Sequence, residues 1–112
     1  MDVSVLGRKD MVPDEVRAMA HAKVARLGRL TPVLEHAEVR LTEDPAAPGA
    51  KRTMCEVTIT GHGHTVRARA GARDPLVAVD KVVDKLEHQV ERLKGKLLAR
   101  SHPRRTREVA EA

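Results

Sequence analysis

The chain of 112 residues carries 21 Lys and Arg against 16 Asp and Glu, a formal net charge of +5, and it contains no aromatic residue. This length is that of one domain, since domains typically hold about 100–150 residues, and it excludes a second catalytic domain. The absence of Phe, Tyr and Trp excludes modules that stack bases on aromatic side chains, while the basic balance favours polyanionic partners. The sequence has neither a membrane-length apolar run nor a secretory signal, and a single cysteine builds no disulfide framework, so we expect a cytoplasmic protein.

The first two expected elements are a short strand and an amphipathic helix. Residues 2–6 alternate apolar and polar side chains before a glycine, a pattern typical of a strand that ends in a turn. Pro13 suits the first helical position, and the two acids after it favour the positive end of a helix dipole. The Thr31-Pro32 break then ends the predicted helix, which covers residues 13–30. Its apolar positions at helical spacing are Val16, Met19, Ala20, Val24, Leu27 and Leu30.

Three strands are expected in the middle of the chain. Residues 37–42, 53–60 and 65–71 each alternate apolar with polar side chains, as half-buried strands do. A stretch rich in Pro and Gly, residues 44–50, separates the first two and breaks regular structure. The last two form a predicted hairpin. If the hairpin turn closes around His62-Gly63, the facing pairs on the solvated side are Glu56 with Arg69 and Thr58 with Arg67.

The longest predicted element is a helix that begins after Asp74, an N-cap residue followed by proline. Its apolar residues step by three and four, which suits either a coiled coil or a helix packed on a sheet; burial on the sheet is favoured because three heptads are a minimum for a coiled coil. That stripe consists of Leu76, Val79, Val83, Leu86, Val90, Leu93 and Leu97. Residues 1–101 are expected to form the domain, and residues 102–112 a disordered basic tail or the start of a linker.

The order strand, helix, three strands, helix predicts an α+β fold with two layers. Strands that are apolar on one face and helices with one apolar stripe require a four-stranded sheet with both helices on the same side. His62, His64 and Cys55 are residue types that bind zinc, but the cysteine is expected in the core and the histidines lie in a turn, so we expect no metal and no cofactor. The sequence shows no nucleophile motif, phosphate loop or paired carboxylates, so we expect no enzymatic activity.

The candidate binding surface is the basic side of the last helix. Carboxylates become rare toward its C-terminal end, where Lys and Arg accumulate, and such residues release counterions from a polyanion. Steps of three and four residues place one stripe of side chains on the same side of the helix. That stripe holds Lys85, His88, Arg92 and Lys96, with Lys81, Lys94 and Arg100 expected to flank it and Lys23, Arg26 and Arg8 expected to extend the surface.

Four segments in register resemble the ribosome hibernation-promoting factors, also called ribosome-associated inhibitors or sigma-54 modulation proteins. They are residues 3–8, 22–27 and 55–61, and most specifically 74–80 together with 84–94. The positions that match the pattern of this last block are Asp74, Ala78, Asp80, Lys85, Leu86, Glu87, Gln89, Arg92 and Lys94. The chain departs from the family at Leu76 and Leu93, where many members carry aromatics, and at residues 71–73, where an acidic-Gly pair is usual.

The resemblance implies a fold similar to double-stranded RNA-binding domains and binding to small-subunit rRNA in the channel between head and body, where mRNA and tRNA sit. Translation would be inhibited by occlusion under stress or in stationary phase. Members are short, or long with a C-terminal domain that dimerises ribosomes; the isolated domain is expected to be monomeric. Two alternatives stay open: a generic double-stranded RNA-binding module, and a structural homodimer formed through the last helix.

Overall fold

The structure, a computed structural model, describes residues 1–101, with side chains up to Ala99; the predicted basic tail lies outside the described residues. Its elements follow the predicted order of strand, helix, three strands and helix. They are β1 (Asp2–Leu6), α1 (Asp14–Leu30), β2 (His36–Glu43), the 3-10 turn η1 (Gly49–Lys51), β3 (Thr53–Gly61), β4 (His64–Ala72) and α2 (Pro75–Ser101).

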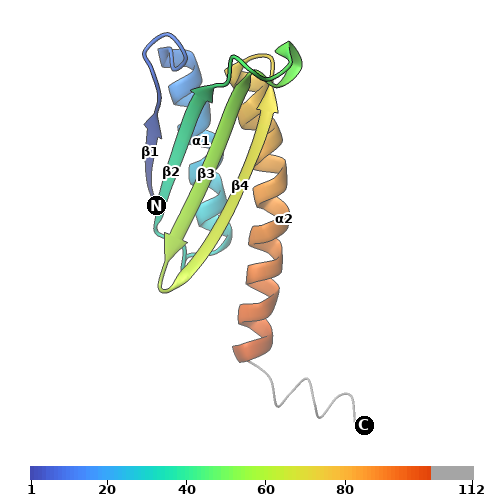
Figure 1. Ribbon diagram of the computed structural model, residues 1–112. Helices are drawn as coiled ribbons and strands as arrows, with labels where there is room; N and C mark the ends of the chain where they lie inside the picture. Colours follow the sequence, from blue (N-terminus) through green and yellow to red (C-terminus); the bar gives the residue numbers. More distant parts are fainter. Residues whose placement is uncertain (102–112) are drawn as a thin grey trace.

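The four strands form one sheet in the order β1-β2-β3-β4. β1 pairs with β2 in parallel, because α1 connects them, and the remaining neighbours are antiparallel. Both helices cover the same face of the sheet and leave the other face open (Figure 1). The predicted α+β two-layer architecture is therefore confirmed.

The core lies between the sheet and the two helices. Val39 and Val57 are completely buried, as the alternation along their strands predicts. In α2, Val79, Leu86 and Val90 are likewise buried, so the apolar stripe of this helix packs into the core of its own domain and is not free to form a coiled coil. Two smaller residues of α2 that lie outside the predicted stripe, Ala78 and Val82, are also fully buried.

The β3–β4 hairpin has the predicted register, with Glu56 opposite Arg69 and Thr58 opposite Arg67. The two turn residues have positive φ angles, 48° at His62 and 78° at Gly63. This conformation matches the twist of a two-residue hairpin and is easiest for glycine. The carboxylate of Glu56 accepts a hydrogen bond from its diagonal neighbour Arg67, at 3.2 Å, rather than from the residue directly opposite.

Helix ends differ from the predictions in two places. Pro13 is the N-cap of α1 and not its first helical residue, because its extended ψ of 164° lies outside the helix while its carbonyl already accepts the amide of Arg17. Leu30 is 43% exposed and not part of the core, because it is the last residue of α1, where the chain leaves the helix. At the start of α2 the predicted cap is confirmed: Asp74 Oδ1 accepts the amide of Val77 at 3.0 Å.

The last turns of α2 extend past the β3–β4 turn (Figure 1). Leu86 and Val90 are fully buried but Leu93 and Leu97 only half-buried, so the buried stripe fades as the helix leaves the sheet. Within residues 1–101, no helix is both long and apolar enough to cross a membrane. Residues 44–50 were predicted to lack regular structure, but the last two of them belong to the single 3-10 turn η1.

Candidate nucleic-acid interface

α2 runs beside β4, the strand at one edge of the sheet. Side chains of α2 form hydrogen bonds with the backbone groups that β4 leaves unpaired at this edge. Lys81, Lys85 and Gln89 are spaced by four residues, which places them about 6 Å apart on one face of the helix. Alternate residues of a strand repeat at about 6.8 Å, so the two spacings nearly match. The resulting bonds run from Lys81 Nζ to the carbonyl of Gly71 (3.3 Å), from Lys85 Nζ to that of Arg69 (2.8 Å) and from Gln89 Nε2 to that of Arg67 (2.7 Å).

Gln89 makes a second bond to the same residue, because its Oε1 accepts the amide of Arg67 at 3.1 Å. The Arg67 and Arg69 side chains project from β4 on the open face of the sheet and are exposed. Cations from the helix and cations from the strand thus line the same boundary. We call this surface the β4–α2 edge; its members are Arg67, Arg69, Lys81, Lys85, Arg92 and Lys96.

Three adjoining hollows follow the β4–α2 edge. The first, about 570 Å³, lies between Lys81 and Arg69, and the second, about 620 Å³, between Lys85 and Arg67. The third, about 330 Å³, lies at the end of the strand beside Arg92. Neighbouring hollows share lining residues, so together they form a continuous, basic depression along the molecule.

The charge of this surface is mostly unneutralised. Within the part of the chain whose side chains are described, Arg69, Arg92 and Lys96 have no ion-pair partner. Lys81 and Lys85 bond to carbonyl oxygens, which orient the ammonium groups without cancelling their charge. The acids at the edge are Glu56, which pairs with Arg67, and Asp84.

Two other predicted residues, Lys23 and Arg26, lie on α1 and pair with carboxylates of α2. Lys23 Nζ contacts Asp80 Oδ1, and Arg26 Nη2 is 3.4 Å from Glu87 Oε1. These pairs join the two helices on the side of α2 away from β4. Their charges are therefore largely compensated.

Arg8 lies in the loop between β1 and α1 and is also paired. It bonds to both carboxylate oxygens of Asp10, at 3.1 and 2.7 Å, and its Nη2 is 3.4 Å from Glu43 Oε2. The hydrogen bond to Asp10 raises the pKa of Arg8, and the same bond lowers the pKa of the Asp10 carboxyl. Arg8 lines none of the hollows of the β4–α2 edge.

Two of the remaining predicted residues, His88 and Lys94, are on α2 but line none of the three hollows. His88 is exposed, and its Nδ1 lies 2.9 Å from the carbonyl of Asp84, one turn earlier in the same helix. Lys94 is two turns after Glu87 and so shares the α1 side of the helix. The Arg100 side chain lies outside the described residues.

Sequence reasoning missed Arg67 and Arg69 as members of the surface. The hairpin register placed both on the solvated face, but their proximity to Lys85 depends on which strand α2 lies beside, and alternation within a strand carries no such information. Cys55 is fully buried as predicted, and burial raises its pKa to about 12. In the described part of the chain, no three His, Cys, Asp or Glu side chains converge as metal ligands would.

The sequence and the fold that carry this surface are similar to those of known proteins. The chain is 30% identical over 92 residues to the ribosome hibernation promotion factor of Deinococcus radiodurans, covering 82% of this chain and 48% of that protein, so it spans about half the length of this relative. The N-terminal domain of Thermus thermophilus Protein Y is similar in structure, with a TM-score of 0.68, 30% identity, and coverage of 83% of this chain and 99% of that one. A ribosomal subunit interface protein from Coxiella burnetii shares the fold, with a TM-score of 0.70, 19% identity, and coverage of 85% and 99%. Residues 3–98 match the model of one family, and the chain therefore belongs to the sigma 54 modulation protein / S30EA ribosomal protein family.

Proposed function

We propose that the protein is a ribosome hibernation factor that binds small-subunit rRNA in the mRNA and tRNA channel and inhibits translation under stress or in stationary phase. The observation that carries the proposal is the row of cations along the β4–α2 edge, of which all but Arg67 lack an ion-pair partner among the described side chains, in a chain of this family. The relative from Deinococcus radiodurans, a ribosome hibernation promotion factor, supports the same role.

Phosphate contact is the mode of binding that these side chains favour. Each Lys or Arg that meets a phosphate releases condensed counterions, which makes the affinity salt-dependent. The chain offers no aromatic platform, so the shape of the depression and the positions of its cations determine the fit. Binding through this surface needs no catalytic group, cofactor or metal, and a rigid domain bound in the channel blocks mRNA and tRNA by occupying their space.

Nine of the ten residues expected to contact rRNA divide by their partners in the structure, and the side chain of the tenth, Arg100, lies outside the described residues. Lys81, Lys85, Arg92 and Lys96 lie along the β4–α2 edge and keep their charge. Lys94 and His88 are exposed on other sides of α2 and would contact rRNA only if it surrounds the helix. Three residues are already paired with carboxylates and must break these ion pairs before they bind a phosphate, so they contribute less to the affinity for rRNA. They are Lys23, Arg26 and Arg8.

Co-sedimentation with purified small subunits tests the proposal. We expect the protein to pellet with the subunits, to dissociate progressively as salt is raised, and to be displaced when mRNA and initiator tRNA are bound first. An excess of generic RNA duplex should not compete. Equal binding to the duplex would instead identify a general double-stranded RNA-binding module, and binding unaffected by mRNA and tRNA would exclude the channel.

A further inference from the structure

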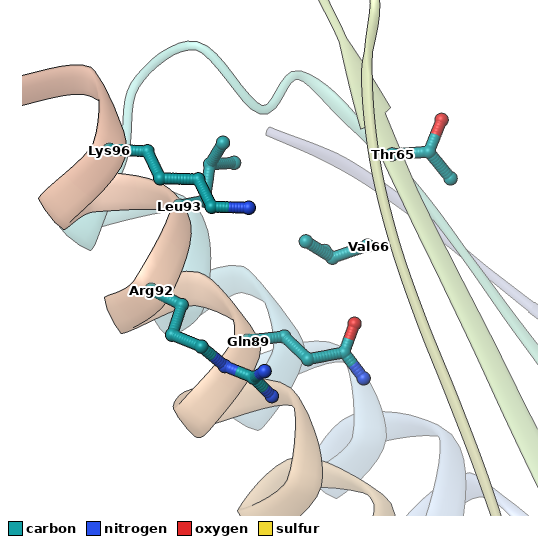
Figure 2. A pocket seen from close by; sticks show the side chains of 6 residues that line it. All are labelled: Thr65, Val66, Gln89, Arg92, Leu93 and Lys96. Carbon is teal, nitrogen blue, oxygen red and sulfur yellow. The ribbon is translucent and has the colours of Figure 1, made fainter. Parts of the chain in front are cut away.

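The third hollow of the β4–α2 edge combines an apolar floor with a cationic rim. Val66 of β4, only 6% exposed, and the half-buried Leu93 of α2 both line it. Figure 2 shows Val66 pointing toward the helix, while Lys96 and Gln89 reach from α2 toward the strand. Its volume of about 330 Å³ is at the lower end of the range for small-ligand sites.

Polar groups around this hollow differ in their availability. Gln89 Oε1 and Nε2 each bond to the backbone of Arg67, so the amide is held in place and only its second N–H and second lone pair remain for a ligand. The charges of Arg92 and Lys96 are one helical turn apart and have no ion-pair partner among the described side chains. A ligand here therefore meets two available cations and an apolar surface.

We propose that this hollow holds the base of one unstacked RNA nucleotide, with its phosphates on Arg92 and Lys96. The inference rests on the proposed function, because it specifies what part of an RNA the β4–α2 edge receives. A base presents a flat, weakly polar face that packs on aliphatic side chains or on an arginine plane, while its backbone carries the negative charge that the rim requires. Since Val66 and Leu93 carry no polar side-chain group and Thr65 points away from the helix (Figure 2), we expect the floor to discriminate little among the four bases.

The choice of a nucleotide over an acidic peptide follows from the same geometry. A carboxylate side chain would satisfy the cations but would leave the floor of Val66 and Leu93 uncovered. A phosphate chain without bases would do the same. Only a ligand that carries both an anion and an apolar face uses the whole hollow. Inorganic polyphosphate carries the anion without the apolar face, so it is a suitable probe for separating the two contributions.

The test compares a single-stranded oligonucleotide with inorganic polyphosphate of the same number of phosphates, using the full chain. Leu93→Ser removes part of the floor, and Leu98→Ser is the matched control because Leu98 is on the same helix, 55% exposed, and does not line the hollow. We expect wild type to bind the oligonucleotide more tightly than polyphosphate. Leu93→Ser should lose about tenfold for the oligonucleotide and nothing for polyphosphate, with an unchanged salt slope, since covering part of a leucine side chain with the base is worth roughly this much. The control should bind both as wild type does.

A second measurement does not depend on how well the variant folds. In methyl NMR spectra of the wild type, the Val66 and Leu93 signals should shift with the oligonucleotide and stay in place with polyphosphate. Shifts with both probes, or with neither, would overturn the inference, as would an unchanged RNA affinity of folded Leu93→Ser. If small subunits still co-sediment with the protein in that case, the proposed function stands and only the nucleotide site fails; loss of co-sedimentation by wild type would refute the function itself.

Discussion

Replacing Gln89 by Ala would remove two hydrogen bonds between α2 and the free edge of β4. An intramolecular hydrogen bond contributes about 0.5–1.5 kcal/mol to stability. Gln89 is half-buried, so water recovers part of the loss, and we expect unfolding to become easier by about 1–2 kcal/mol. For a domain of about 100 residues this corresponds to a fall in Tm of roughly 5–15 °C.

Thermal unfolding followed by circular dichroism measures this fall, and hydrogen exchange locates it. The matched control is Glu91→Ala, because Glu91 is an exposed residue of α2 without a hydrogen bond or ion pair to any described side chain; it should change stability by less than about 0.5 kcal/mol. In Gln89→Ala, the amide of Arg67 should exchange faster because it loses its acceptor. The reasoning is refuted if both variants melt alike and the Arg67 amide stays protected.

Three further outcomes follow from individual groups. In Arg8→Ala, the pKa of Asp10 should rise toward its ordinary 3.8, as measured by carboxyl NMR; because the pair lowers this pKa in the folded state, its stabilising effect is present above the ordinary value and is lost as the pH falls through the folded one. The Cys55 thiol, whose pKa is raised by burial, should resist iodoacetamide at pH 8 and react once urea unfolds the chain. Treatment with a chelator should leave Tm unchanged, and a large drop would reveal a structural metal.

The fold was predictable because local patterns decide most of it. The alternation in β3 and β4, together with the turn at His62-Gly63, sets a register in which a shift by one residue would expose Val57. The apolar stripe of α2 likewise indicated which side is buried. The small residues Ala78 and Val82 were missed because a stripe of large residues marks only the middle of the buried face.

The binding surface was predicted only in part, because partners distant in sequence decide which cations stay available. Lys23 and Arg26 looked free, yet their carboxylate partners are 57 and 61 residues away along the chain. Arg69 was seen only as a member of a hairpin pair. Its place beside Lys85 follows from the packing of α2 along β4, which spacing within one element does not reveal.

The structure also shows which cations of the surface can be removed without disturbing the fold. Lys85 bonds to the carbonyl of Arg69, so its replacement would affect both charge and the β4 edge. The side chains of Arg92 and Lys96 have no hydrogen bond or ion pair to another described residue, so their removal isolates the effect of charge. The matched control removes the same amount of charge at Lys9 and Arg29, which are exposed and line none of the three hollows.

Co-sedimentation of these two double variants with small ribosomal subunits, over a series of salt concentrations, tests the central claim most directly. Arg92→Ala with Lys96→Ala should weaken binding at least about tenfold and lower the salt slope by about 1.5–2, since two phosphate contacts are lost. Lys9→Ala with Arg29→Ala should bind nearly as wild type does. Equal losses in the two variants would mean that net charge alone drives binding, and wild-type binding by Arg92→Ala with Lys96→Ala would show that the β4–α2 edge is not the surface that meets the ribosome.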